Sequence, residues 1–282
     1  MGNWFKTMVL FVALAALLML IGGAVAGRTG VLVALVVSLG INLFSYWFSD
    51  KMVLASYHAV ELTEADAPRV HAVVTQLSQA AGIPKPRVYR IPDDSPNAFA
   101  TGRDPAHAVV AVTDGVLQLL DEEELKGVLG HELAHVKHRD ILIGTVAASV
   151  ASAIMFIASI ARWGAIFGGY GGSRDRDGAN PIALLVAAVV APLAALLIQM
   201  AISRSREYAA DEAGAGFAGN PMGLAGALKK LQAYSARIPL QATPATSHMF
   251  IVKPFTGGGL TSLFSTHPPI EKRIARLMER RG

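Results

Sequence analysis

The residues of this chain best suited to chemistry are two histidines four positions apart, His131 and His135, with Glu132 beside the first. On a helix such histidines share one face, with Cβ atoms about 5 to 6 Å apart, so both imidazoles can bind one metal ion. A glutamate next to that metal can take a proton from the attacking water and pass it to a leaving amine. The spacing predicts a hydrolytic zinc site, and the alternative is two solvated histidines on an amphipathic helix.

Four stretches without a charged residue interrupt the chain: residues 7–27, 29–49, 141–161 and 178–203. Each has at least 21 residues, enough to cross about 30 Å of hydrocarbon at 1.5 Å per residue. They keep the charged fraction at 16%, which disfavours a plain cytosolic enzyme. The first stretch also resembles a signal peptide, and the last two could form a buried hairpin in a soluble core. Their length and lack of charge favour four transmembrane helices.

The distribution of basic residues predicts which side of the membrane holds the soluble parts. Four crossings put both termini, residues 50–140 and residues 204–282 on one side. Near the membrane that side carries Lys6, Lys51, Lys137, Arg139, Arg204 and Arg206, whereas the other side carries Arg28, Arg162, Arg174 and Arg176. The positive-inside rule makes the first side cytoplasmic. The net charge of +4 is scattered, so the expected partner is the lipid bilayer and not nucleic acid.

A catalytic zinc ion usually has three protein ligands, and the chain has no cysteine to supply one. His138 lies on nearly the same face as His131, but three ligands on one straight helix cannot surround an ion. Glu207 follows the fourth apolar stretch, which returns the chain to the membrane face that it leaves after His135, so Glu207 is the favoured third ligand. Asp211 could hold the outer nitrogen of a liganding imidazole. The alternative for both carboxylates is an exposed charged face.

The soluble parts predict a mixture of helices and strands. Asp121 and Glu124 resemble a capping box at the start of the helix that carries His131. Strands are expected at 87–91, 97–101 and 108–113, and further helices at 63–82, 204–217, 222–236 and 270–281.

Together these features resemble the HtpX family of membrane zinc metalloproteases, which is related to the CAAX prenyl endopeptidases and other gluzincin-type proteases. The resemblance covers nearly the whole chain: the four spans, residues 97–102, 131–135, 207–211 and 266–269, and Arg273. It implies one Zn²⁺ per chain held by His131, His135 and Glu207, with Glu132 as general base and acid. It also implies a stress-response protease that degrades misfolded or damaged membrane proteins in a bacterial inner membrane.

Peptide hydrolysis also needs a donor for the oxyanion of the tetrahedral intermediate. His267 and Arg273 are the catalytic candidates for this role, and His248 is a weaker rival. The alternative is that Pro268 ends a loop and Arg273 lies on a solvated helix.

Substrate binding is predicted at Asn97, Ala98, Phe99 and Ala100, as an edge strand that pairs with an extended substrate through backbone hydrogen bonds. That mode recognises backbone more than side chains, which suits a protease with many misfolded substrates. The alternative is an ordinary internal strand.

The expected fold is a membrane α+β protein, with four transmembrane helices and a mainly helical zincin-like catalytic domain that contains a small β-sheet. Residues 7–49 and 141–203 form the two transmembrane hairpins, and residues 50–140 and 204–282 form the two parts of the metalloprotease domain. Two other functions remain open: a narrow processing protease of the prenyl-peptide type, and a scaffold that keeps zinc for structure.

Overall fold

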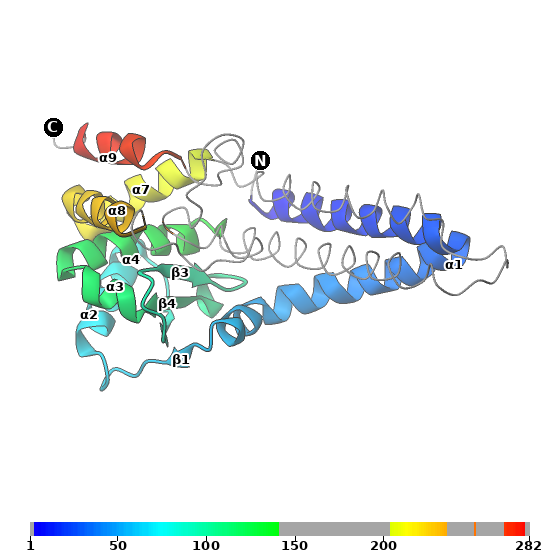
Figure 1. Cartoon of the computed structure of the whole chain (residues 1–282), viewed down its shortest axis with the longest axis horizontal. Coiled ribbons are helices and arrows are strands. Elements are labelled where there is room, and N and C mark those ends of the chain that lie inside the picture. Colours follow the sequence, from blue (N-terminus) through cyan, green and yellow to red (C-terminus); the bar gives the residue numbers. More distant parts are fainter. Residues whose placement is uncertain (1–2, 141–203, 236–250, 252–267, 280–282) are drawn as a thin grey trace. The chain divides into compact units, whose positions relative to one another are not determined.

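The computed structural model describes residues 3–140, 204–235, 251 and 268–279 (Figure 1). The chain divides into two compact units, residues 1–47 with 146–201 and residues 48–145 with 202–282. The second unit contains all the described candidate site residues. The expected spans at 141–161 and 178–203, together with His248 and His267, lie outside the described residues.

Helix α1 (Asn3–Ser56) carries the first two expected spans and reverses direction at Gly27 (Figure 1). The φ angle of Gly27 is 56°, a left-handed conformation that glycine adopts without steric cost. Past the turn the two arms come close, since a Cβ on Gly22 would lie 2.3 Å from the backbone oxygen of Gly30. Among the described residues, one segment is long and apolar enough to cross a membrane, Gly27–Phe48, with a mean hydropathy of 2.0.

Four strands form one mixed sheet in the order β1-β2-β4-β3. They are β1 (Val60–Glu61), β2 (Arg87–Ile91), β3 (Ala98–Thr101) and β4 (Val109–Thr113). β2 runs parallel to β4, and the other two pairs are antiparallel. The three predicted strands are confirmed, two of them starting one residue later than expected. Two residues are too few to show a strand period, so β1 was not predicted.

Both faces of the sheet are covered. Side chains alternate along a strand, so Val110 and Val112 of β4 join the core of the helices, whereas Val109 and Ala111 pack with Val53 and Leu54 at the end of α1. The helical core includes α2 (Pro68–Ala81) and α4 (Glu122–Lys137). Among the described strands, β3 stands last in the sheet order, as expected of an edge strand.

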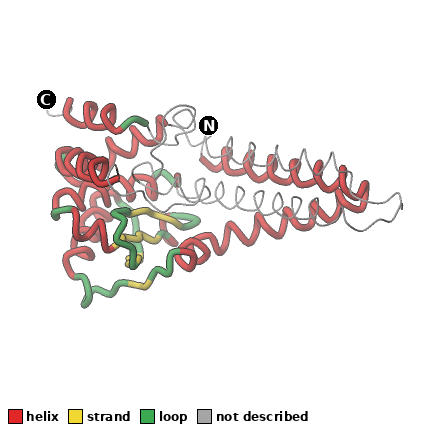
Figure 2. The backbone as a smooth tube through the Cα atoms, viewed as in Figure 1, coloured by secondary structure: helices red, strands yellow, loops and turns green. Residues whose placement is uncertain are grey.

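Helices make up most of the described chain (Figure 2). The predicted capping box of α4 is confirmed: Glu124 donates its backbone N–H to Asp121, and Asp121 donates its own to Glu124. The later helices are α7 (Arg204–Ala218), α8 (Pro221–Ser235) and α9 (Ile270–Glu279), close to their predicted bounds. A short α3 (Asp114–Leu119) follows β4. Helix α2 begins at Pro68, because Thr63 and Asp66 form a turn before it.

Candidate metal centre and active site

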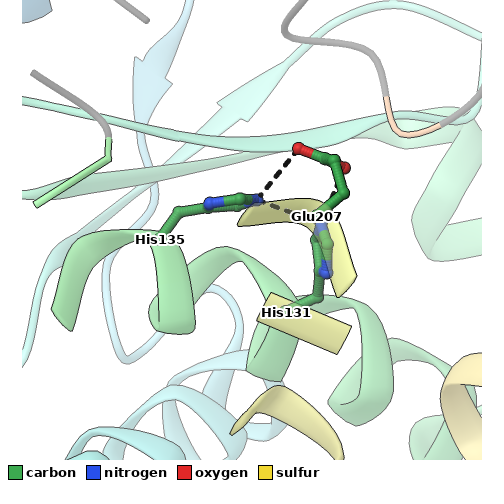
Figure 3. A group of neighbouring side chains, drawn as sticks. All are labelled: His131, His135 and Glu207. Atoms are coloured by element: carbon green, nitrogen blue, oxygen red, sulfur yellow. Dashed lines mark hydrogen bonds and ion pairs between the residues drawn. The ribbon is translucent and has the colours of Figure 1, made fainter. Parts of the chain in front are cut away.

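Helices α4 and α7 bring His131, His135 and Glu207 together (Figure 3). The two Nε2 atoms lie 3.2 Å apart, and the carboxylate oxygens of Glu207 lie 3.5 Å from Nε2 of His135 and 3.8 Å from Nε2 of His131. Ligand atoms of a tetrahedral zinc with bonds of about 2.1 Å are about 3.4 Å apart. The three side chains therefore have the spacing that one zinc ion requires.

The outer nitrogens of both imidazoles face carboxylates. Nδ1 of His131 lies 2.9 Å from Asp211, and Nδ1 of His135 lies 3.2 Å from Asp140. If each Nδ1–H is donated to its aspartate, both Nε2 atoms carry lone pairs that face the oxygens of Glu207. Three acceptors then meet without a donor among them, an arrangement that a shared cation satisfies.

The charges around His135 also favour a cation. Burial lowers the pKa of this imidazole, but its hydrogen bond to Asp140 and the charges of Glu207 and Glu132 outweigh burial and raise the pKa to about 9. The negative charge of Glu207, which lies 3.5 Å from Nε2, also favours a metal ion there, whereas Asp140 acts on the opposite nitrogen, Nδ1. The chemistry of the donor set thus fits the expected zinc.

Asp211 is held in turn by Arg273 of α9. The guanidinium binds both carboxylate oxygens, with Nε at 2.9 Å and Nη2 at 2.6 Å. Burial raises the pKa of Asp211, but the charge of Arg273 and the hydrogen bonds from His131 and Arg273 lower it to about 2. Asp211 is therefore ionised and can accept the proton of His131.

The position of Arg273 differs from the one expected of an oxyanion donor. Its side chain is fully buried, and besides Asp211 it contacts the carbonyl of Ile251 and lies 3.4 Å from Nδ1 of His131. Arg273 is therefore placed to hold Asp211 and His131 in position rather than to contact a substrate. The sequence carries a signal for this position: Arg273 stands three residues after Ile270 and four before Leu277, so it shares the apolar face of α9.

Glu132 is connected to the edge strand. Its Oε2 accepts a hydrogen bond from the backbone N–H of Ala100, at 3.0 Å. Asn97 bonds to Thr113 on β4, so by the alternation of an antiparallel pair the backbone groups of Ala98 and Ala100 point away from β4, toward the edge of the described sheet. The carboxylate therefore lies beside the outward backbone groups of β3.

The side chains of the predicted substrate-binding residues are mostly buried. Asn97 accepts the backbone N–H of Ile251, and Phe99 packs against Tyr57 with ring centroids 5.6 Å apart. Ala98 is also buried and Ala100 is partly buried. Among the described residues, this strand thus offers few side-chain atoms at its outer edge.

One contact of the site was missed from the sequence: Asp140, beside His135. A carboxylate shortly after the histidine motif was the available signal, but five residues along a helix it would face away from His135. His138 caps the end of α4, is exposed, and is not part of the His-His-Glu cluster.

The segments that form this centre fall within one family match: residues 64–281 match Peptidase family M48. The chain belongs to peptidase family M48. Among M48 relatives, a protease HtpX homolog of Desulfatibacillum aliphaticivorans is 57% identical over 277 residues, which cover 98% of this chain and 89% of the relative. A protease HtpX homolog of Ralstonia pickettii is 54% identical over 284 residues, covering 99% and 97%.

A solved structure shares the M48 chain's fold. The crystal structure of S. mikatae Ste24p matches with a TM-score of 0.52 at 18% identity, over 86% of this chain and 57% of that one. Family membership and the HtpX relatives confirm the predicted metalloprotease function. The narrow processing protease and the zinc scaffold are not favoured. The apolar segment Gly27–Phe48 agrees with the predicted attachment to a membrane.

Proposed function

We propose that this M48 chain hydrolyses peptide bonds of misfolded or damaged membrane proteins with one zinc ion, held by His131, His135 and Glu207. We place it in a bacterial inner membrane as a multi-pass protein, with the catalytic unit on the cytoplasmic side. The observation that carries the proposal is the bond between Glu132 and the Ala100 amide, because it connects the helix of the metal ligands to the outer strand of the described sheet.

The chain's own residues supply the proton transfers. When bound, the zinc ion supplies a Lewis acid that polarises the scissile carbonyl and acidifies water. Glu132 accepts the proton of the attacking water and delivers it to the leaving amine. Ala100 anchors one oxygen of this carboxylate, Oε2, which leaves Oε1 for the proton. Asp211 keeps Nδ1 of His131 protonated, so Nε2 stays available as a ligand.

Strand β3 selects the substrate by its backbone. The N–H of Ala100 is bonded to Glu132, so an extended peptide would pair with the outward groups of Ala98 and the outward carbonyl of Ala100, and become a further strand of the sheet next to Glu132. Folded proteins rarely offer an unpaired extended segment, because their backbone groups are already hydrogen-bonded. The preference for misfolded chains follows from this requirement.

The catalytic role is tested with Glu132→Gln, which keeps the size of the side chain but removes the base. We expect the variant to retain zinc and to lose casein cleavage by about 10²- to 10⁴-fold. Glu122→Gln is the matched control, since Glu122 lies exposed on the same helix, and it should cleave like the wild type. Equal cleavage by Glu132→Gln and the wild type would remove Glu132 from the mechanism.

The ligand assignment and the substrate class have separate tests. Glu207→Ala should lower the zinc content at limiting metal, and an unchanged content contradicts the assignment. For the substrate, the wild type is given unfolded casein, a misfolded membrane protein and a prenylated peptide. We expect faster cleavage of the two unfolded proteins; exclusive cleavage of the prenylated peptide would support the narrow processing function instead.

A further inference from the structure

The chain turns sharply where helix α4 ends. Arg139 has a φ angle of 59°, a left-handed conformation that residues other than glycine rarely adopt. If the helix continued, Asp140 would be five residues beyond His135 and rotated from it by about 140°. The left-handed turn at Arg139 instead brings the carboxylate of Asp140 back to the imidazole.

Asp140 lies between His135 and an arginine from the neighbouring helix. Its Oδ2 is 3.2 Å from Nδ1 of His135, and its Oδ1 is 3.8 Å from Nε of Arg206. The side chains of Asp140 and Arg206 are 8% and 10% exposed, so both groups are largely shielded from water. Buried charges of this kind are normally paired, and here the pair is directed at one metal ligand.

The order of groups repeats the one behind the other histidine. Behind His131, an arginine pairs with the aspartate that contacts the imidazole: Arg273 with Asp211. Behind His135, Arg206 pairs with Asp140 in the same way. His135 has the greater need of support, since its side chain is 15% exposed against 3% for His131. Without a partner on Nδ1, a partly exposed imidazole near the end of a helix can rotate and change its tautomer.

We propose that Asp140, itself held by Arg206, is a positioning residue that fixes the His135 ring with Nε2 directed at the metal. This inference rests on the proposed role of His131, His135 and Glu207 as zinc ligands. It adds that the strained turn at Arg139 serves the metal site. Loss of a hydrogen-bond partner behind a liganding imidazole lowers metal affinity by about 10- to 100-fold.

The test compares Asp140→Asn and Asp140→Ala with the wild type in the full-length purified protein. Zinc affinity is measured by competition with a chelator, and the visible spectrum of the Co²⁺-loaded protein reports the ligand geometry. We expect both variants to lose affinity about 10- to 100-fold, Ala more than Asn, with an altered Co²⁺ spectrum. Arg206→Gln should produce a smaller loss in the same direction, because it acts through Asp140.

Two controls separate positioning from stability. Asp114→Asn breaks the ion pair with Arg90 elsewhere in the same unit and should leave zinc affinity unchanged. Arg139→Gly keeps the left-handed turn without its steric cost and should also keep wild-type affinity. Thermal unfolding with excess chelator shows whether the variants fold. If Asp140→Ala does not fold, the zinc affinity and Co²⁺ spectrum of the isosteric Asp140→Asn variant decide whether Asp140 is a positioning residue.

The outcomes distinguish this inference from the proposed function. Wild-type zinc affinity and an unchanged Co²⁺ spectrum in both Asp140 variants overturn the positioning role, whatever happens to casein cleavage. If the Asp140 variants bind zinc more weakly than the wild type and the wild type itself cleaves no protein, the positioning role is supported and the protease proposal is contradicted.

Discussion

At the scale of single residues, the site depends on charges that are buried and paired. Arg273 is fully buried, yet it stabilises the site because both of its bonds to Asp211 neutralise a carboxylate that contacts His131. Arg276, one helical turn away on α9, instead lies over the ring of Tyr208 at the surface. We therefore expect the two arginines of this short helix to contribute very differently to the free energy of unfolding.

Removal of Arg273 tests that difference. Arg273→Met leaves Asp211 as a buried, unpaired anion, and we expect it to lower the free energy of unfolding by about 3 to 5 kcal/mol in denaturant titrations. The control Arg276→Met should lose less than about 1 kcal/mol. Combining Arg273→Met with Asp211→Asn should cost less than the sum of the single changes, because the second change removes the unpaired charge. A strictly additive result would show that the two residues are not coupled.

At the scale of elements, the metal ligands meet because α4 and α7 come unusually close. A Cβ on Gly130 of α4 would lie 2.7 Å from the backbone oxygen of Gly214, and a Cβ on Gly214 of α7 would lie 2.5 Å from the backbone nitrogen of His131. Glu207, Asp211 and Gly214 stand four and three residues apart, so they share the face of α7 that packs against α4. The glycines thus set the helix separation at which Glu207 reaches both histidines.

A single methyl group between the two helices should therefore disturb the site. We expect Gly214→Ala to force the helices apart, to destabilise the fold by about 1 to 3 kcal/mol and to weaken zinc binding. Gly216→Ala is the matched control, because a Cβ there meets no atom within 4 Å. It should be neutral or stabilise the helix by up to about 1 kcal/mol. Zinc titration and thermal unfolding of both variants check this, and equal behaviour would show that close helix contact is not required.

At the scale of the whole molecule, the metal site is assembled from two segments of the chain that residues 141–203 separate. Asp140 immediately precedes that stretch and Arg206 closely follows it, and the two side chains form an ion pair beside His135. The proposed site is therefore placed where the chain enters and leaves the predicted second transmembrane hairpin. Its orientation in the membrane decides which proteins it can reach.

The absence of cysteine makes this orientation measurable without background. Arg28→Cys places a thiol at the exposed turn of α1, and Glu122→Cys places one on the surface of the catalytic unit. By the positive-inside rule, a membrane-impermeant maleimide should label the first variant in intact spheroplasts and the second only after lysis. The opposite labelling pattern would contradict a cytoplasmic active site.

Sequence alone determined the features that depend on short-range order. The spacing from His131 to His135 and the capping box at Asp121 follow from one turn of helix, and the strands follow from short runs separated by turn-rich segments. Glu207 was inferred from the number of apolar stretches between it and His135. These patterns are readable because the residues involved are near one another in the chain or joined by segments of known direction.

Only the tertiary structure decided the support behind the metal ligands. Arg273 reaches Asp211 from a helix far along the chain, and its burial depends on how α9 packs. Asp140 reaches His135 because of one backbone angle at Arg139, which residue type does not reveal. The bond from Ala100 to Glu132 requires a strand edge and a helix to meet at 3.0 Å. Such contacts arise from packing between distant segments, and no local pattern of residues encodes them.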